Sequence, residues 1–219
     1  MTSAAPVPAT RSWAEEAEDR VLDAAVRLAP SLGWGRNLVE RAAAEAGLSG
    51  ADAGLLLPGG PRDLAALLSR RHDAAGRERL ADVDPSTLKI RERIRRGVQA
   101  RVEAAAADQE AVRRCTAWLA LPHNLALALS LLWESADAIW RWAGDTATDE
   151  NHYSKRAILS AVLATTIGVR FQRGVLAADE HLDAQIERVM RFEKWKAGRP
   201  KPSEIMTSIA AALGRMRYR

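Results

Sequence analysis

Two apolar segments, separated by a polar stretch, constrain the fold of this chain more than any other part of its sequence. They lie within residues 118–170, on either side of the polar residues 141–155. Leu alternates with Ala and Ser at the start of the first segment, which taken alone is a strand pattern. Leu and Ala favour helices, however, and no β-branched residue of this segment precedes Ile139. The second segment, 157–169, is apolar nearly all round. We therefore expect two buried helices that neighbouring elements cover on most sides.

Composition sets the limits of the fold and its setting. The 219 residues, 47% hydrophobic and 27% charged, suffice for one large core or for a core with a small satellite domain. Apolar runs fall short of the ~20 residues that a membrane-spanning helix requires, and Pro122 interrupts the best candidate. The single cysteine, Cys115, excludes an internal disulfide framework and a four-cysteine zinc site. We expect a soluble protein in a reducing compartment, and the excess of Arg over Lys favours the bacterial cytoplasm.

Residues 13–82 have the spacing of a helix-turn-helix region, after a tail at 1–12 that we expect to be disordered. Helices are predicted at 13–28, ended by Pro30, at 38–46, and from Asp63 onward. The turn at 43–49 resembles that of TetR-type repressors, so an all-α, TetR-like helical bundle is predicted. Between residues 48 and 61 the only charged residue is Asp52, which disfavours contact with DNA phosphates. We expect no nucleic-acid partner, and we expect the three leucines at 55–57 to pack in the core.

Residues 86–103 form a predicted amphipathic helix. Its apolar stripe consists of Leu88, Ile90, Ile94, Val98 and Val102, and its cations are Lys89, Arg91, Arg93, Arg95, Arg96 and Arg101. We interpret the cations as a solvated outer face, the alternative being a site for phosphate groups or anionic lipid. The preceding polar residues, Arg70, Arg71, His72, Arg77 and Arg79, are likewise expected to face solvent.

The polar stretch between the two apolar helices carries the most distinctive motif. Residues 140–159 read W-x-W-A-G-D-x-x-T-D-x-N-x-Y-[ST]-K-R-A-x-L, with a Leu-rich helix before and Ala-Thr-Thr at 164–166 after it. This string resembles the isoprenoid-lipid-binding accessory family of ubiquinone biosynthesis, the family of the ninth Coq protein. The resemblance implies a non-catalytic protein that binds an isoprenoid or quinone lipid and assists the di-iron demethoxyubiquinone hydroxylase. The rival interpretation is a TetR-type, ligand-responsive transcriptional regulator.

Periodicity alone does not separate a filled core from a lipid cavity in the central helices, and the resemblance favours a cavity. The residues expected to line it are Leu125, Leu129, Leu132, Trp133, Ile158, Val162 and Ile167. The resemblance also implies that the polar stretch contacts the hydroxylase, since it mixes large aromatic rings with charge. The residues expected to bind this partner are Trp142, Asp145, Asp149, His152, Tyr153 and Arg156.

Catalytic and metal-binding patterns are not found in the sequence. It has no HExxH, no Glu-x-x-His pair, no GxSxG, no Walker A loop and no GxGxxG. Asp145, Asp149 and His152 could form an acid/base group, but helix capping by Thr148 or Asp149 explains this stretch more simply. We therefore assign no catalytic residue and no metal ligand, and we expect no cofactor.

The C-terminal residues form a last predicted element. A helix is expected from Asp183, then a break at 198–202, then a final amphipathic helix that Ser203 caps. Its stripe and cations suit an anionic membrane surface, so the protein would lie peripherally on the inner membrane. The stripe equally allows packing on the body or on a second copy in a homodimer. The membrane-binding set is Ile205, Ile209, Leu213, Met216, Arg215 and Arg217. The predicted organisation is thus a tail at 1–12, a helix-turn-helix-like region at 13–82, a lipid-binding domain at 83–197, and a linker with the membrane helix at 198–219.

Overall fold

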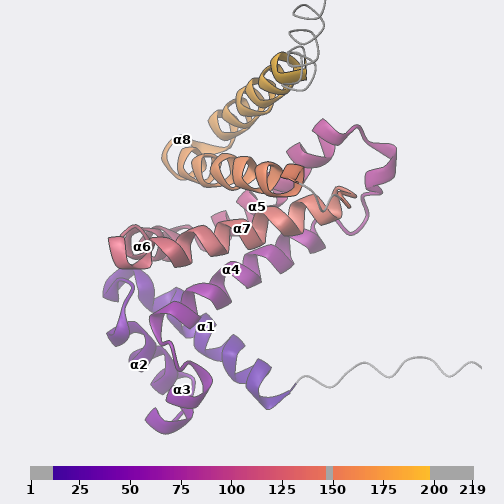
Figure 1. Ribbon diagram of the computed structural model, residues 1–219. Helices are drawn as coiled ribbons and strands as arrows, with labels where there is room; N and C mark the ends of the chain where they lie inside the picture. The colour runs from indigo at the N-terminus through magenta and orange to yellow at the C-terminus, as the bar shows by residue number, and fades with distance from the viewer. Residues whose placement is uncertain (1–11, 147–149, 198–219) are drawn as a thin grey trace, which may run out of the picture.

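The computed structural model describes residues 12–146 and 150–197, and over these residues the protein is built from helices with no strand (Figure 1). The predicted all-α class is confirmed, while the TetR-like arrangement and the domain boundaries stay predictions. Short 3-10 turns, η1 (Pro85–Thr87) and η2 (Pro122–Asn124), connect some of the helices. The helices are α1 (Trp13–Leu32), α2 (Arg36–Glu45), α3 (Gly50–Leu56), α4 (Pro61–Glu78), α5 (Ile90–Ala107), α6 (Gln109–Leu119), α7 (Leu125–Trp142) and α8 (Glu150–Ala197).

Two hydrophobic clusters hold the helices together. The first joins α1, α2 and α4 to α6 and includes the fully buried Leu38 and Leu64. The second joins α5 and the end of α7 to α8 and includes the fully buried Leu163 and Leu182. In Figure 1, α1 to α3 lie at one end of the molecule and α8 at the other, with α4 and α7 between them. The second cluster is therefore the one that positions the polar stretch between α7 and α8.

The first helix is longer than its sequence predicts. Ser12 caps it by accepting a hydrogen bond from the Glu15 backbone, and the Glu15 carboxylate accepts one from the Ser12 backbone in return. The helix continues past Pro30 and ends before Gly33, which has a φ of 72°. A proline in the last turn removes only one helical hydrogen bond, whereas a positive φ stops the helix outright. The predicted end at residue 28 was therefore wrong.

The leucines of α3 do not all pack in the core, contrary to prediction. Leu57 is buried, but Leu55 is 83% exposed. Successive residues of a helix point about 100° apart, so a short helix that lies on the body cannot bury three neighbours at once. An Arg at position 55 would therefore face solvent and is not expected to disrupt the fold.

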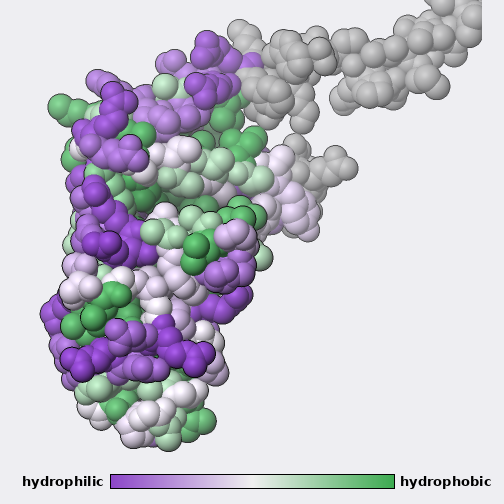
Figure 2. All heavy atoms as spheres, turned by 90° about the vertical axis from the view of Figure 1, so that its left-hand side faces the viewer, coloured by the Kyte–Doolittle hydropathy of each residue, from purple (hydrophilic) through white to green (hydrophobic). Residues whose placement is uncertain are grey.

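The central helix α7 is covered on one side only, so the prediction of burial on most sides was wrong. Leu131, Ser135, Ala136 and Ile139 are buried, while Leu129 is 66% exposed. Leucines at alternate positions spread around a helix instead of lining one face. The surface turned to the viewer in Figure 2 is correspondingly mixed, with separate hydrophobic areas among hydrophilic residues.

The longest helix, α8, consists of two halves. Gly174 has a φ of 87°, outside helical values, and the halves meet there at a sharp bend (Figure 1). The second half therefore begins before Asp183, where the sequence predicted a helix start. Within the described ranges, no individual helix has the length and apolar character needed to cross a membrane.

Two residues predicted to face solvent, His72 and Arg101, are buried between α4 and α5. His72 Nε2 lies 2.9 Å from Asp108 Oδ2, and Arg101 Nε donates to Asp73 Oδ1 at 2.5 Å. The Asp73 carboxylate makes the burial of Arg101 tolerable, because a buried cation without a partner would cost several kcal/mol, and Asp108 gives the His72 ring a hydrogen-bond partner. Neither burial was predicted, because the periodicity of one helix gives no information about acids on neighbouring elements. Here Asp73 of α4 contacts Arg101 of α5, and Asp108, which follows α5, contacts His72 of α4.

We predict that His72 makes the protein sensitive to mild acid. Burial lowers the pKa of His72 below its ordinary value of 6.5, helped by the charges of Arg101 and Arg71 and opposed by Asp108. The unfolded chain therefore binds a proton more readily than the folded one, and stability is lost as pH falls through 6.5 toward the folded-state pKa. The melting temperature should fall between pH 7.5 and 5.5, and His72→Gln should reduce this slope. Equal slopes for both proteins would contradict the prediction.

Candidate functional site

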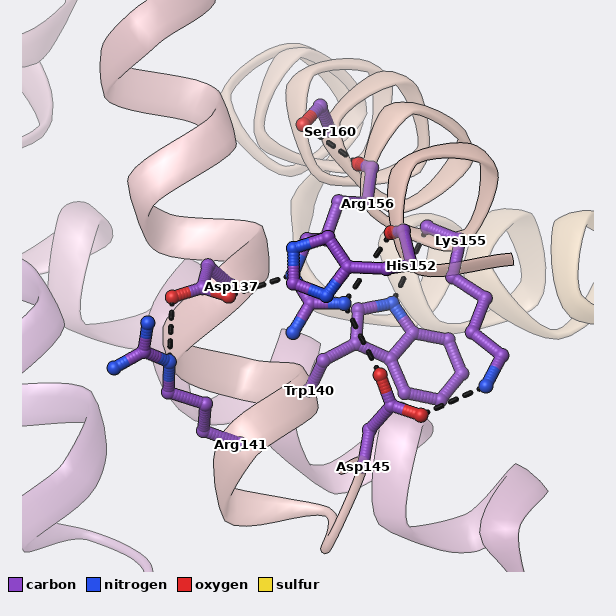
Figure 3. A network of polar contacts seen from close by, with 8 residues as sticks. All are labelled: Asp137, Trp140, Arg141, Asp145, His152, Lys155, Arg156 and Ser160. Carbon is purple, nitrogen blue, oxygen red and sulfur yellow. Dashed lines mark hydrogen bonds and ion pairs between the residues drawn. The ribbon is translucent and has the colours of Figure 1, made fainter. Parts of the chain in front are cut away.

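A buried ion-pair network joins the end of α7 to the start of α8. We call Asp137, Asp145, Lys155 and Arg156 the hinge network. Arg156 Nε donates to Asp137 Oδ1 at 2.6 Å, and its Nη1 donates to Asp145 Oδ2 at 3.0 Å. Lys155 Nζ donates to the other Asp145 oxygen at 2.7 Å. Figure 3 shows the Arg156 side chain between the two carboxylates. The network thus ties two helices across residues 141–155.

Burial and pairing define the electrostatics of this network. The side chains of Arg156 and Asp145 are only 2% and 6% exposed. Desolvation raises the pKa of the Asp145 carboxyl, but hydrogen bonds from Lys155 and Arg156 together with their charges outweigh it, so the pKa lies below its ordinary value. Asp145 is therefore ionised at neutral pH. Its lowered pKa also makes it a weaker base than an ordinary aspartate.

The backbone at the end of α7 is shaped to hold this network. Gly144 has a φ of 86°, which favours glycine, and it follows the last turn of α7. Arg93 of α5 donates from Nη1 to the Ala143 carbonyl at 2.7 Å, so it satisfies a helix-end acceptor from across the bundle. Trp140 Nε1 donates to the Lys155 carbonyl at 3.2 Å. The A-G-D portion of the motif, residues 143–145, thus has a structural role at the end of α7.

An aromatic cluster of Trp133 on α7 and His152 and Tyr153 on α8 lies beside the network. The Trp133 ring centroid is 6.0 Å from that of Tyr153 and 6.5 Å from that of His152. The rings of His152 and Tyr153 meet edge to face at 5.2 Å. Tyr153 is 65% exposed, so the cluster presents an aromatic ring to solvent. Such a ring on a fixed platform is suited to contact with another protein.

An apolar cavity of about 370 Å³, which we call the hinge cavity, lies between α5, α7 and both halves of α8. Its volume falls within the range of small-molecule sites. The charged residues Arg91, Arg93, Asp145 and Lys155 also line it, the last two as members of the hinge network. Its apolar lining comprises Ile90, Ile94, Trp140, Ala143, Ile158, Leu159, Val162, Ile186, Val189 and Met190.

The residues predicted to bind lipid are divided by the structure. Ile158 and Val162 line the hinge cavity, whereas Leu125, Leu132 and Ile167 line a separate cavity of about 260 Å³ between α4, α5, α6, α7 and the first half of α8. Leu129 and Trp133 line neither, since Leu129 is exposed and Trp133 belongs to the aromatic cluster. Three further lining residues, Ile186, Val189 and Met190, were not predicted, because nothing in the sequence indicates that α8 bends back at Gly174. Arg91 and Arg93 were predicted only as members of an alternative site for phosphate groups or anionic lipid.

The residues predicted to bind a partner are also divided. Tyr153 is exposed, and Trp142 and His152 are partly buried. Asp145 and Arg156 lie inside the hinge network instead of on the surface, so they support this surface from within. Asp149 lies outside the described residues, as do the six residues of the predicted membrane-binding set. In the ranges 12–146 and 150–197, no group of three or more His, Cys, Asp or Glu is placed to hold a metal ion.

These features define an all-α protein with an apolar cavity, cations at one edge of that cavity and an exposed aromatic cluster beside it. Residues 125–193, which include α7, the hinge network and most of α8, match the COQ9 family model. The resemblance to the COQ9 family is thereby confirmed: the chain is similar to that family over these residues.

Three curated relatives show how far this similarity extends. The mitochondrial ubiquinone biosynthesis protein COQ9 of Homo sapiens is 29% identical over 164 residues, which is 72% of this chain and 52% of the relative. The corresponding proteins of Xenopus tropicalis and Bos taurus are each 28% identical over 164 residues, covering 72% of this chain and 52% and 51% of the relatives. The chain spans about half the length of the curated relatives it matches.

Proposed function

We propose that this chain is a non-catalytic accessory protein of ubiquinone biosynthesis that binds an isoprenoid or quinone lipid in the hinge cavity and presents it to the demethoxyubiquinone hydroxylase. The observation that carries the proposal is the position of the hinge cavity. Most of its lining residues belong to the segment that matches the COQ9 family, and the lining combines apolar side chains with the cations Arg91, Arg93 and Lys155. This arrangement suits a molecule with a greasy tail and a polar head.

The lining of the hinge cavity supports this choice of ligand. Leu159 and Val162 are buried at its floor, while Ile90 and Met190 are each 46% exposed at its mouth. A lipid can therefore enter from the surface with its apolar portion on the floor. Arg91, exposed on α5, offers a cation to a polar head at the mouth.

The aromatic cluster of Trp133, His152 and Tyr153 is the proposed surface for the hydroxylase. It lies on the same two helices as the hinge network, and Tyr153 directly precedes Ser154 and Lys155, which line the cavity. A partner bound there would therefore be close to the lipid. Trp142 and Asp149 remain proposed members of this surface.

The setting that we propose is the surface of a membrane. Val189 and Met190, on the second half of α8, line the hinge cavity, and α8 ends at Ala197. The membrane-binding set within residues 205–217 would then hold the cavity against anionic lipid. We keep the bacterial inner membrane as the proposed location, and a homodimer as the proposed assembly.

The alternative function, a TetR-type regulator of transcription, is supported by fewer features of the structure than lipid binding is. A recognition helix needs cations toward DNA phosphates, and α3 carries one charged residue, Asp52, together with the exposed Leu55. We therefore place the function in lipid handling.

The lipid proposal is tested by filling the hinge cavity. Ile186→Trp should lower the amount of isoprenoid lipid that co-purifies at least ten-fold, because the larger ring occupies the ligand's space. Mass spectrometry of the extracted lipid measures this change. Leu176→Trp, on the same helix at a residue that is 80% exposed, is the matched control and should retain the lipid. Equal lipid content in both variants would contradict the proposal.

The partner proposal is tested at Tyr153. Tyr153→Ala should lower the affinity for the hydroxylase at least ten-fold, while Tyr153→Phe, which keeps the ring, should lower it much less. Co-purification and titration of the purified proteins measure this effect. Trp13→Ala removes another aromatic side chain, 59% exposed on α1, and should leave the affinity unchanged. If Tyr153→Ala lowers the melting temperature in step with the affinity, the residue acts on folding instead.

A further inference from the structure

The mouth of the hinge cavity is bordered by exposed apolar side chains. Ile90 of α5 and Met190 of α8 are the two large hydrophobic residues of its lining that are exposed, at 46% each. They come from different helices yet border one cavity, so both lie where it opens to the surface. Single exposed hydrophobic side chains are common on proteins. Two at the mouth of an apolar cavity instead form the edge of a hydrophobic surface that continues inward, and such a surface marks a contact site.

Two cations without acidic partners flank Ile90. Lys89 precedes it, Arg91 follows it, and both are exposed. The acid nearest in sequence, Glu92, is engaged by Arg96 at 2.9 Å. Over residues 12–146 and 150–197, neither Lys89 nor Arg91 has a carboxylate within ion-pair distance. Their charge is therefore available to an anionic partner.

Arg93 fixes the backbone that presents this edge. Its Nε donates to the Leu88 carbonyl at 2.9 Å, and its Nη1 donates to the Ala143 carbonyl at 2.7 Å. The first contact secures the residue before Lys89, and the second ties it to the end of α7. A surface that is held in place before its partner arrives loses little conformational entropy on binding.

The size of this edge indicates which partner fits it. A stable protein–protein interface covers about 800 Å² of each partner, which is far more than two apolar side chains offer. A bilayer, by contrast, accepts single side chains at its surface, and the phosphates of anionic lipids attract neighbouring cations. The hinge cavity, at about 370 Å³, is also near the lower end of the range for small-molecule sites, so it encloses only part of a long lipid tail. The remainder needs apolar surroundings at the mouth, which a bilayer supplies.

We infer that the mouth of the hinge cavity is itself a membrane-contact surface. Ile90 and Met190 enter the hydrocarbon edge of an anionic bilayer, while Lys89 and Arg91 lie at its phosphates. The inference rests on the proposed membrane setting and deepens it, because it assigns a contact to the folded body in addition to the set within residues 205–217. A lipid then passes between bilayer and cavity without crossing water.

The depth of this contact is measured with a nitroxide spin label on the full-length chain. Ile90→Cys and Met190→Cys place the label at the mouth, and Leu55→Cys places it on exposed α3, at the other end of the molecule from α8 (Figure 1). Cys115 does not compete for the label, because burial raises its pKa to about 12. On vesicles of phosphatidylglycerol and phosphatidylcholine, the accessibility of the labels at 90 and 190 to a water-soluble nickel chelate should fall at least five-fold. The label at 55 should be unchanged.

Two results of this experiment would overturn the inference. Vesicle-bound protein whose labels at residues 90 and 190 remain accessible to the chelate would show that another segment makes the contact. Absence of vesicle binding by the wild-type protein would overturn the proposed membrane setting as well. The lipid proposal is judged separately, by the lipid that co-purifies with the protein.

A pair of charge reversals tests the role of the cations. Lys89→Glu combined with Arg91→Glu should weaken vesicle binding at least ten-fold in a sedimentation assay, because each cation near an anionic surface contributes about five-fold. Arg36→Glu combined with Arg41→Glu changes the net charge equally at exposed residues of α2 and should have a much smaller effect. Equal losses in the two double variants would show that net charge acts instead of this surface, and would overturn the inference.

Discussion

Arg156→Met should destabilise the protein by about 3–5 kcal/mol, since it removes the cation from a buried network and leaves two carboxylates behind. The Arg156 side chain is 2% exposed and bridges Asp137 to Asp145, which is itself nearly buried. Met fills a similar volume, so the loss would reflect charge more than packing. Chemical denaturation at pH 7.5 measures the change in the free energy of unfolding.

The matched control for this prediction is Arg141→Met. Arg141 pairs with the same Asp137 at 2.7 Å, but its side chain is 73% exposed. Exposed ion pairs contribute only about 0–1 kcal/mol, so this variant should be close to wild type. Similar losses for Arg141→Met and Arg156→Met would show that burial of the network contributes little.

Leu182→Ala should cost about 2–5 kcal/mol, because it opens a space in the second hydrophobic cluster. Leu182 is fully buried and lies on the half of α8 that follows Gly174. With the partly buried Ile186, it anchors that half to the rest of the cluster. Thermal and denaturant unfolding measure the loss.

Leu176→Ala provides the comparison on the same helix. Leu176 is 80% exposed, so truncating it should change stability by no more than about 0.5 kcal/mol. A small effect of Leu182→Ala, equal to that of Leu176→Ala, would mean that the second half of α8 does not depend on its buried contacts.

The sequence predicted helices better than it predicted their surroundings. The all-α class followed from helix-forming residues and from breaks at Gly and Pro, which act locally. Burial depends instead on which elements meet, and there the predictions failed for Leu55, Leu129 and His72. Acids on one helix and a buried base on another can be paired only when the packing of the two helices is known.

For the candidate site too, the sequence predicted the location better than the surroundings of each residue. The motif at 140–159 identified the segment that holds the hinge network, and the family match confirmed the resemblance. Which of its residues face inward did not follow from the motif, because Arg156 looks the same in sequence whether it is exposed or buried. The contribution of residues 186–190 to the hinge cavity requires the bend in α8, and one glycine among fourteen gives no sign of a bend.

The bend at Gly174 makes one helix supply two opposite walls of the hinge cavity, one from residues 154–162 and one from residues 186–190. The width of this cavity is therefore geometrically coupled to the backbone torsion angles of a single residue. Apart from the adjoining backbone, no atom lies within 4 Å of the position that a Cβ would take at Gly174, so lack of space does not explain the glycine there. The positive φ requires glycine, because a side chain at this position would cost roughly 1–2 kcal/mol in that conformation. Relaxing toward a continuous helix would separate the walls, so any side chain at residue 174 favours an opened, shallower cavity over the closed one.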